Sequence, residues 1–444
     1  KTNLEESRAA KEITFVLDTS GSMSGEKLDQ AKRALKFALD HLNRNDRFNL
    51  ISFSGDVELF RPHLVDATPE SVAAARRFVE ELQARGGTNI HDALLAALKQ
   101  QSPRRGVPAM ILFLTDGLPT VGVTDLKEIL SNVNKTRVEG LRLFVFGVGD
   151  DVNTYLLDRL SGENGGVSEY VRPGEDLEVK VSSFYTKIAT PALSNLELDY
   201  GGAEVYDVYP KRLPDLFAGT QVLVTGRYRK PGRFTLTLRG SVGGEPRRFT
   251  YPADFSGEDR GTSFIPRIWA TRKVGYLLDE LRLHGHNQEL VDEVTRLGME
   301  YGIVTPYTSA LVEEDRRPGP RPYPPPVPLG GPAPFGGAAQ EAAKSTGSGA
   351  VDVAVRLREA KEAGQVRDEG GMVRHVEGKT FSLRGDTWVD VQYRPEMRAR
   401  EVRFASDEYF ALMQRQPKLA RWFALGERVL VVWQGEAIKV IPAD

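Results

Sequence analysis

The chain has 444 residues, no cysteine, and 61 acidic against 59 basic side chains, for a net charge of −2. This length allows two or three domains with a substantial core. The near-neutral balance gives no reason to expect nucleic acid or an anionic membrane as a partner. Disulfides and cysteine metal sites are excluded, and no apolar run reaches the roughly 20 residues that cross a bilayer.

The first part of the chain, residues 12–190, alternates apolar strands with amphipathic helices. Thr68 is a good N-cap and Pro69 fits the first position of the helix that follows it. This alternation predicts an α/β fold of Rossmann type, an open and mostly parallel sheet between helices. Strands are expected at 13–17, 48–53, 109–114, 141–148 and 169–171, and helices at 28–42, 69–82, 91–98, 125–136 and 175–188.

Three loops of this region carry oxygen-bearing side chains directly after predicted elements. Asp18, Ser20 and Ser22 leave the first strand, Thr88 lies in a Gly-Gly-Thr-Asn loop, and Asp116 follows the strand that ends at 114. Ligands of open parallel sheets bind beyond the carboxyl ends of the strands, where these loops are expected. A small hard cation prefers oxygen ligands, so the pattern predicts a divalent metal site.

The Asp-x-Ser-x-Ser motif with its two partner loops resembles the von Willebrand factor A domain. In that family the five matching residues form a metal-ion-dependent adhesion site, and here they are Asp18, Ser20, Ser22, Thr88 and Asp116. The resemblance implies that the three hydroxyls approach the metal directly, while the two carboxylates often act through water. It also implies a sixth position left for a carboxylate of a partner protein. Mg²⁺ is the expected ion, with Mn²⁺ and Ca²⁺ as alternatives.

The expected function is therefore metal-dependent binding of a protein that presents an Asp or Glu, and not catalysis. Neighbours in the same loops are expected to contact the partner: Gly21, Met23, Asn89 and Gly117. Two other readings stay open, a scaffold whose metal only stiffens the loops and a metal-dependent hydrolase. For the hydrolase, His91 is the sole nearby candidate base, although it is expected in the first turn of its helix.

From residue 191 to 315 the pattern changes to short strands separated by Pro and Gly, which predicts an antiparallel β-sandwich. A helical pair follows, and residues 301–312 read as a returning strand. The strands are expected at 196–198, 205–209, 220–228 and 232–238, and the helices at 265–283 and 288–300.

The stretch Gly302-Ile303-Val304-Thr305-Pro306-Tyr307-Thr308-Ser309 sharpens the resemblance. A von Willebrand A domain, strands, a helix pair and this stretch are similar to the inter-alpha-trypsin inhibitor heavy chains, and closer still to their bacterial relatives. The likeness covers about residues 12–314. It implies a periplasmic, secreted or cell-surface location, and an upstream β-domain that we expect to be missing, since the chain opens with Lys1. The sequence has no Asp-Pro pair, so covalent attachment to a glycosaminoglycan is not expected.

Residues 316–349 are rich in Pro, then in Gly, Ala and Ser, and are expected to form a linker. Residues 350–444 are expected to form a small α+β domain with tryptophans in its core. Arg384-Gly385-Asp386 reads as a hairpin turn, and the His284 and His286 pair as solvated rather than metal-binding. Helices are expected at 351–363, 406–412 and 417–425, and strands within 372–393 and at 429–433 and 437–441.

Overall fold

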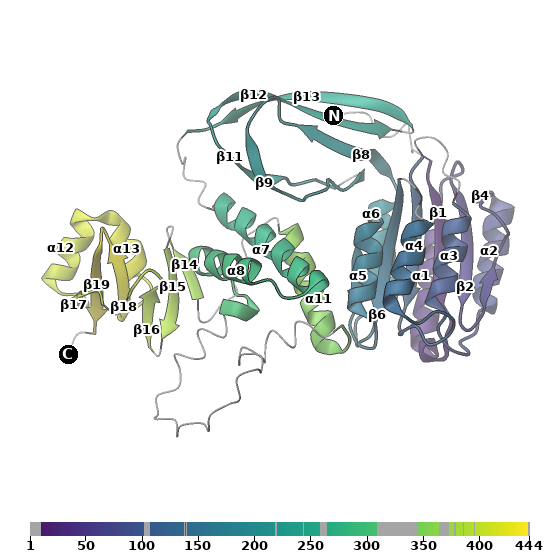
Figure 1. Cartoon of the computed structure of the whole chain (residues 1–444), viewed down its shortest axis with the longest axis horizontal. Helices are drawn as coiled ribbons and strands as arrows, with labels where there is room; N and C mark the ends of the chain where they lie inside the picture. The colour runs from purple at the N-terminus through teal and green to yellow at the C-terminus, as the bar shows by residue number, and fades with distance from the viewer. Residues whose placement is uncertain are drawn as a thin grey trace, which may run out of the picture. The chain divides into compact units, whose positions relative to one another are not determined.

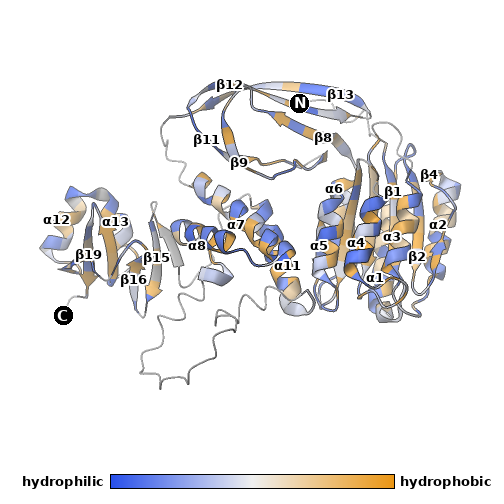
Figure 2. Cartoon of the chain, in the orientation of Figure 1, coloured by the Kyte–Doolittle hydropathy of each residue, from blue (hydrophilic) through white to orange (hydrophobic). Residues whose placement is uncertain are grey.

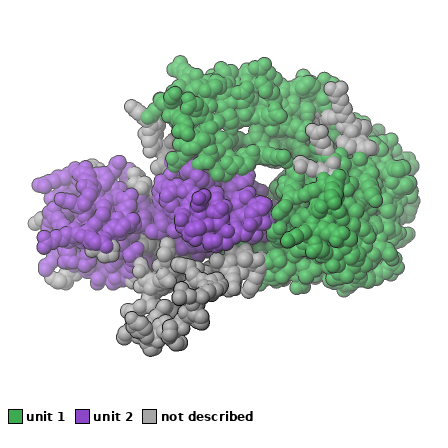
Figure 3. All heavy atoms as spheres, in the orientation of Figure 1, with its two compact units in different colours: residues 1–257, 344–356 green, residues 258–343, 357–444 purple. Residues whose placement is uncertain are grey.

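The computed structural model describes residues 10–101, 107–136, 138, 140–217, 220–242, 244–257, 264–308, 345–363, 373–376, 379–384, 386–394 and 396–442. The chain divides into two compact units (Figure 3). The first comprises residues 1–257 and 344–356, and the second residues 258–343 and 357–444. Of the linker expected at 316–349, residues 316–344 lie outside the described residues.

The first unit is built on a seven-stranded sheet with strand order β3-β2-β1-β5-β6-β7, in which β4 also pairs with β2 (Figure 1). The five long central strands are parallel, and only the short β3 and β4 are antiparallel to β2. The predicted open, mostly parallel sheet is confirmed. Its strands are β1 Glu12–Asp18, β2 Arg47–Phe53, β3 Val57–Leu59, β4 Val65–Asp66, β5 Ala109–Thr115, β6 Leu141–Val148 and β7 Ser168–Val171.

Six helices cover the two faces of this sheet, and each face has its own apolar core. One core joins α1, α2 and α6 to the sheet, and the other joins α3, α4 and α5. In Figure 2 these helices carry both hydrophobic and hydrophilic residues, as expected of amphipathic helices that pack on a sheet. Their bounds are α1 Glu26–Asp40, α2 Pro69–Glu81, α3 Ile90–Lys99, α4 Leu126–Lys135, α5 Thr154–Glu163 and α6 Leu177–Ile188.

Local capping explains where these helices begin. The Thr68 hydroxyl accepts from the Ser71 amide at 3.2 Å, and the Ser71 hydroxyl accepts from the Thr68 amide at 3.0 Å, which forms a capping box. Helix α5 was absent from the sequence prediction. Its N-cap is Asn153, whose side chain accepts from the Leu156 amide at 2.9 Å.

The following region consists of two antiparallel sheets, with strand orders β10-β8-β12-β13 and β11-β9 (Figure 1). The strand expected at 220–228 is shorter, since only Thr225–Tyr228 is a strand, and β13 was not predicted. Arg142 of β6 donates to both carboxylate oxygens of Asp215 at 2.9 Å, which ties this region to the parallel sheet. The strands are β8 Pro191–Asp199, β9 Val205–Tyr209, β10 Leu216–Phe217, β11 Thr225–Tyr228, β12 Gly232–Val242 and β13 Glu245–Phe255.

The second unit begins with the predicted helical pair, α7 Phe264–His284 and α8 Gln288–Tyr301. The strand predicted at 301–312 is wrong for its described part. Gly302 adopts a left-handed φ of 66° and ends α8, and residues 306–308 are helical. The Thr305 amide donates to the Thr308 hydroxyl at 2.8 Å, a local bond that replaces a strand ladder. Residues 309–312 lie outside the described part.

The C-terminal segment is an α+β unit on a six-stranded sheet with order β14-β15-β16-β18-β19-β17. Trp388 and Trp422 lie in its core, as expected. No helix among the described residues combines the length and apolar character needed to cross a membrane. The elements are α11 Ser348–Glu362, which crosses the division between the units, then β14 Val373–Val376, β15 Lys379–Arg384, β16 Thr387–Asp390, β17 Ala399–Arg403, α12 Asp407–Arg415, α13 Pro417–Phe423, β18 Val429–Trp433 and β19 Glu436–Ile441.

Candidate metal centre

The three loops meet because of the strand order of the first unit. Strands β1 and β5 are parallel neighbours with Leu17 opposite Leu114, so their loops leave the same edge of the sheet side by side. The loop that precedes α3 is held there by backbone bonds. The Gly21 amide donates to the Gly86 carbonyl at 3.0 Å, and the Arg85 amide donates to the Thr19 carbonyl at 2.8 Å.

Asp18 is fully buried at the end of β1. One of its oxygens accepts from the Ser20 amide at 2.8 Å, and the other accepts from the Thr115 hydroxyl at 2.6 Å. Burial raises the pKa of Asp18 to about 6, because the charged carboxylate is poorly solvated there. The bonds from Thr115 and Ser20 lower this pKa in part, and the nearby charge of Asp116 raises it further.

A row of oxygens joins the first and third loops. The hydroxyls of Ser20 and Ser22 lie 3.0 Å apart, and the Ser22 hydroxyl donates to Asp116 Oδ1 at 2.7 Å. Ser20 and Asp116 are almost completely buried, whereas Ser22 is exposed. The cluster is therefore open to solvent on the Ser22 side.

Thr88 reaches the same place from the loop before α3. Its amide donates to the Thr120 hydroxyl at 2.8 Å, and the Thr120 amide donates to the Thr88 carbonyl at 2.9 Å. A Cβ atom placed on Gly117 would lie 3.4 Å from Thr88 Oγ1 and 3.9 Å from Ser22 Oγ. Both hydroxyls thus lie beside the same glycine, and the structure brings all five predicted side chains together.

The chemistry of this donor set fits a hard divalent cation. The cluster offers three hydroxyls and two carboxylates and no nitrogen or sulfur ligand, which is the ligand type that Mg²⁺, Mn²⁺ and Ca²⁺ accept. Across the described part of the chain, no group of three or more His, Cys, Asp or Glu side chains is placed to hold a metal ion. A metal in this cluster would therefore depend on the hydroxyls as well as the carboxylates.

One residue of the cluster was missed by the sequence prediction. Lys27, in the first turn of α1, places Nζ 2.6 Å from Asp116 Oδ2 and 3.4 Å from the Ser22 carbonyl oxygen. Its side chain is 40% exposed, whereas that of Asp116 is fully buried. The helix dipole disfavours a cation at a helix N-terminus. A lysine at this position was therefore the one feature of the sequence that could have drawn attention to Lys27.

The four predicted partner contacts divide into two pairs. Gly21 is exposed and Gly117 is partly exposed, so both lie on the accessible rim. Met23, in contrast, is fully buried in the core and is not available to a partner. Asn89 is also buried, and its side chain caps α3 by accepting from the Asp92 amide at 3.2 Å. As placed, Met23 and Asn89 support the loops, and the expectation that they touch the partner is corrected.

His91 lies in the first turn of α3, as expected. Its Nδ1 lies 2.8 Å from Asp92 Oδ1, and its Nε2 lies 3.2 Å from the Asn132 side-chain nitrogen on α4. Both ring nitrogens are thus engaged away from the five-residue cluster. This arrangement gives His91 a structural role between the two helices.

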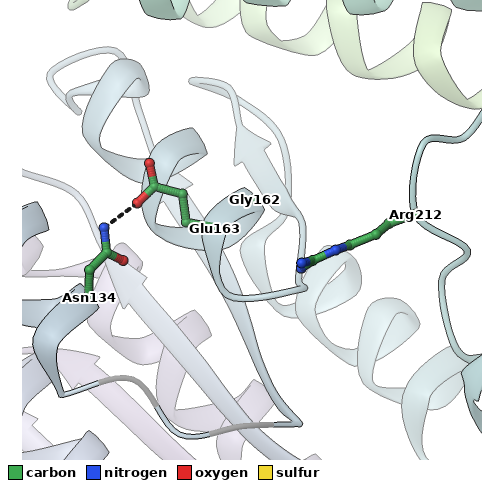
Figure 4. A pocket seen from close by; sticks show the side chains of 4 residues that line it. All are labelled: Asn134, Gly162, Glu163 and Arg212. Atoms are coloured by element: carbon green, nitrogen blue, oxygen red, sulfur yellow. Dashed lines mark hydrogen bonds between the residues drawn. The ribbon is translucent and has the colours of Figure 1, made fainter.

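Described residues of the first unit line hollows in two places. One, of about 580 Å³, lies beside the Thr88 loop and is lined by Asn89, Gly55, Asp92 and Leu95 among others. The other, of about 390 Å³, lies at the C-terminal ends of α4 and α5, where Asn134 donates to Glu163 at 2.7 Å beside Gly162 and Arg212 (Figure 4). Helix C-termini in such a fold lie at the edge of the sheet opposite the metal loops, so the second hollow is separate from the cluster.

The two minor motifs can be placed in the structure. The His284 Nε2 lies 3.5 Å from Glu280, and both side chains are exposed. Arg384 pairs with Thr387 across the hairpin of β15 and β16, which confirms the hairpin, although Gly385 itself lies outside the described residues.

Comparisons with known proteins agree with this architecture. The family model of the von Willebrand factor type A domain matches residues 11–170. Inter-alpha-trypsin inhibitor heavy chain H4 of Homo sapiens is 34% identical over 323 residues, which cover 68% of this chain and 34% of that protein. Heavy chain H2 of Mus musculus is 31% identical over 326 residues, which cover 69% of this chain and 34% of that protein.

A solved structure described as von Willebrand factor type A from Catenulispora acidiphila has the same fold. It aligns with a TM-score of 0.50 and 17% identity, and covers 81% of this chain and 90% of that one. The chain spans about a third of the length of the curated relatives named above. The chain is therefore a von Willebrand factor A domain protein that is similar, over about two thirds of its length, to inter-alpha-trypsin inhibitor heavy chains.

Proposed function

We propose that the first domain binds a carboxylate of a partner protein through a divalent cation, most simply Mg²⁺. The proposed ligands are Asp18, Ser20, Ser22, Thr88 and Asp116. The observation that carries the proposal is the continuous row of oxygens from Ser20 through Ser22 to Asp116, at 3.0 and 2.7 Å, with the Thr88 hydroxyl beside it.

The charges of the cluster favour an incoming carboxylate. Asp18 and Asp116 supply two formal charges, and the hydroxyls supply none. A bound divalent ion would keep strong attraction for a further anion, since few of its ligands are charged and the site is partly desolvated. Both oxygens of Asp18 already accept hydrogen bonds, from Ser20 and Thr115, which suits a role through water rather than direct contact.

The rim of the cluster is suited to a protein partner. Leu118 and Val121 follow Asp116 in the same loop and are 39% and 37% exposed. Apolar side chains exposed beside a polar centre are typical of protein-binding surfaces, where they supply contact area around a specific polar contact. Gly21 and Ser22 of the first loop are also exposed.

The test is a capture experiment on the immobilised chain in Mg²⁺ and in EDTA. The Ser20→Ala/Ser22→Ala variant removes two proposed ligands, whereas Ser24→Ala removes an exposed hydroxyl of the same loop and serves as the matched control. We expect a partner that is retained in Mg²⁺ by the wild type and the control, and released by EDTA or by the double substitution. Conversion of the partner's carboxylates to amides with a carbodiimide and a small amine should also abolish capture. A partner retained equally in EDTA would refute the proposal.

The two alternatives make different predictions. If the cation only stiffened the loops, Mg²⁺ would raise the melting temperature with no metal-dependent partner. If the chain were a hydrolase, Mg²⁺-dependent turnover of generic esters or phosphoesters would appear and would be lost in Asp116→Ala. We propose that the chain is not an enzyme, because the ring nitrogens of His91, the one expected base, are both engaged elsewhere.

We also propose that the chain works outside the cytoplasm, in the periplasm or at the cell surface. The proposal extends the sequence resemblance to secreted and exported relatives. Fractionation of the source cells followed by immunodetection tests it, and detection in the cytoplasmic fraction alone would refute it.

A further inference from the structure

Among the described residues, Lys27 is the one cation in contact with the five-residue cluster. Neither helix stability nor surface charge explains this contact. It lies in the first turn of α1, where a positive charge opposes the helix dipole. Its Nζ nevertheless reaches Asp116 Oδ2 at 2.6 Å and the Ser22 carbonyl oxygen at 3.4 Å. The contact therefore concerns the cluster and not the helix.

The cluster needs positive charge when no metal is bound. Asp18 and Asp116 are both buried in one cluster, where two carboxylate charges repel each other. Buried carboxylates remain charged only where a cation or several hydrogen bonds compensate for the lost water. Lys27 provides such a cation from within the chain, at the carboxylate that lies closest to the exposed Ser22.

The same contact uses a site that a metal would need. Asp116 Oδ1 accepts from the Ser22 hydroxyl and Oδ2 accepts from the Lys27 ammonium group, so both oxygens are engaged. A divalent ion or its bound water that engages Asp116 would compete with these two donors for the carboxylate. An ammonium group held within a few ångströms of a divalent cation would also repel it, because the two charges have the same sign.

We propose that Lys27 is a tethered competitor of the divalent cation. In the metal-free protein its ammonium group neutralises Asp116, and on metal binding it gives up Asp116 Oδ2. Since the Lys27 side chain is 40% exposed, it can turn into solvent without disturbing the core. The inference rests on the metal site proposed above, and it makes Lys27 a residue that sets metal affinity without being a ligand.

The test is isothermal titration of the full chain with MgCl₂, on the wild type, Lys27→Met and Lys27→Arg. Methionine keeps the length and apolar stem of lysine but removes the charge, so we expect Mg²⁺ to bind about tenfold more tightly. Arginine keeps the charge and should stay within about twofold of the wild type. Lys36→Met is the matched control, because Lys36 lies on the same helix and pairs with Glu80 at 2.7 Å.

A second readout is the melting temperature of the metal-free chain. In EDTA, Lys27→Met should melt at a lower temperature than Lys36→Met, because Asp116 loses its compensating charge. Addition of saturating Mg²⁺ should remove this difference, since the bound ion then compensates the carboxylates of both variants.

The outcomes separate this inference from the metal site on which it rests. Mg²⁺ that binds the wild type and Lys27→Met with equal affinity overturns the competitor role and leaves the metal site standing. Weaker binding to Lys27→Met also overturns it, since it would make Lys27 a supporting residue. Binding seen only in Lys27→Met supports the inference, and no binding to any variant overturns both proposals.

Discussion

Strand β1 has a buried charge cluster at each end, and the two clusters differ in how completely they are neutralised. At the start of the strand, the Lys11 side chain pairs with Asp46, and both are fully buried. Asp46 also accepts from the Lys11 amide at 3.0 Å and from the Asn43 amide at 2.7 Å. At the end of the strand, the cation found among the described residues is the partly exposed Lys27, which contacts Asp116 and not Asp18.

The difference separates a structural ion pair from a binding site. In the Lys11 cluster the described residues place one ammonium group against one carboxylate, which also accepts from two backbone amides, and both side chains are closed to solvent. The other cluster has two carboxylates, three hydroxyls and one tethered cation, and opens at Ser22. An incomplete charge balance beside solvent leaves room for a ligand, whereas a closed, buried pair is costly to break from one side, because the remaining charge is left unpaired.

The largest expected effect is on the free energy of unfolding, through the Lys11 cluster. Asp46→Ala removes the carboxylate opposite a buried ammonium group, so we expect unfolding to require about 3–5 kcal/mol less free energy. Urea unfolding in EDTA measures this loss. Mg²⁺ affinity should stay within about twofold of the wild type, because the substitution lies at the opposite end of β1.

Asp66→Ala is the control for that experiment, since it removes an exposed carboxylate from β4. It should cost no more than about 0.5 kcal/mol. A loss below about 1 kcal/mol in Asp46→Ala would show that the Lys11 cluster is not the structural ion pair described above.

The next effect is the pH dependence of Mg²⁺ binding and of stability, which the five-residue cluster sets through Asp18. The pKa of Asp18 is raised from 3.8 to about 6, chiefly by burial, and a metal requires the ionised form. Mg²⁺ affinity should therefore fall roughly tenfold per pH unit below pH 6. The metal-free protein should become less stable as the pH rises from about 4 to about 6, because the folded state holds the Asp18 proton more tightly.

Calorimetric titrations with MgCl₂ at several pH values, together with melting curves in EDTA, measure both trends. Asp18→Asn should abolish the pH dependence of the melting temperature in this window. If the Mg²⁺ affinity stays about constant between pH 5 and pH 7, the raised pKa does not belong to a residue that binds the metal, and the assignment to Asp18 is contradicted.

A smaller effect is expected from Thr115→Val. The Thr115 hydroxyl donates to Asp18 at 2.6 Å and lowers its pKa, so its loss should move the pH midpoint of Mg²⁺ binding upward. The shift should be roughly one pH unit, since a hydrogen bond to a charged group contributes about 1.5 kcal/mol. Thr14→Val removes a buried hydroxyl elsewhere on β1 and should leave the midpoint unchanged. A downward shift in Thr115→Val would contradict the account.

The sequence predicted those parts of the fold that repeat a strong pattern. Buried parallel strands such as Ala109–Thr115 are continuous apolar runs, and α2 has a complete capping box at Thr68, so both were recognisable. Strand β13 was missed because its residues are exposed on both faces and show no alternation. The strand predicted from Tyr301 failed because Gly302 ends a helix there, which the apolar pattern does not reveal.

The candidate site was predictable for the same kind of reason. Asp18, Ser20, Ser22, Thr88 and Asp116 follow predicted strands or glycine turns in the order that the sheet requires, so their convergence could be expected. Lys27 could not be expected to join them, because its position depends on a side chain reaching across to β5. Met23 was misplaced because an apolar residue in an exposed loop can turn inward, and only the three-dimensional packing shows that it does.

The central claim is that five side chains hold a divalent cation, and a crystal soaked in MnCl₂ tests it most directly. Manganese scatters X-rays anomalously, so an anomalous difference map shows where it is bound and distinguishes it from the lighter atoms around it. We predict one anomalous peak among the oxygens of Ser20, Ser22 and Thr88, with the Lys27 ammonium group turned away from Asp116. No peak in the cluster, or a peak elsewhere with Lys27 still bound to Asp116, would contradict the claim.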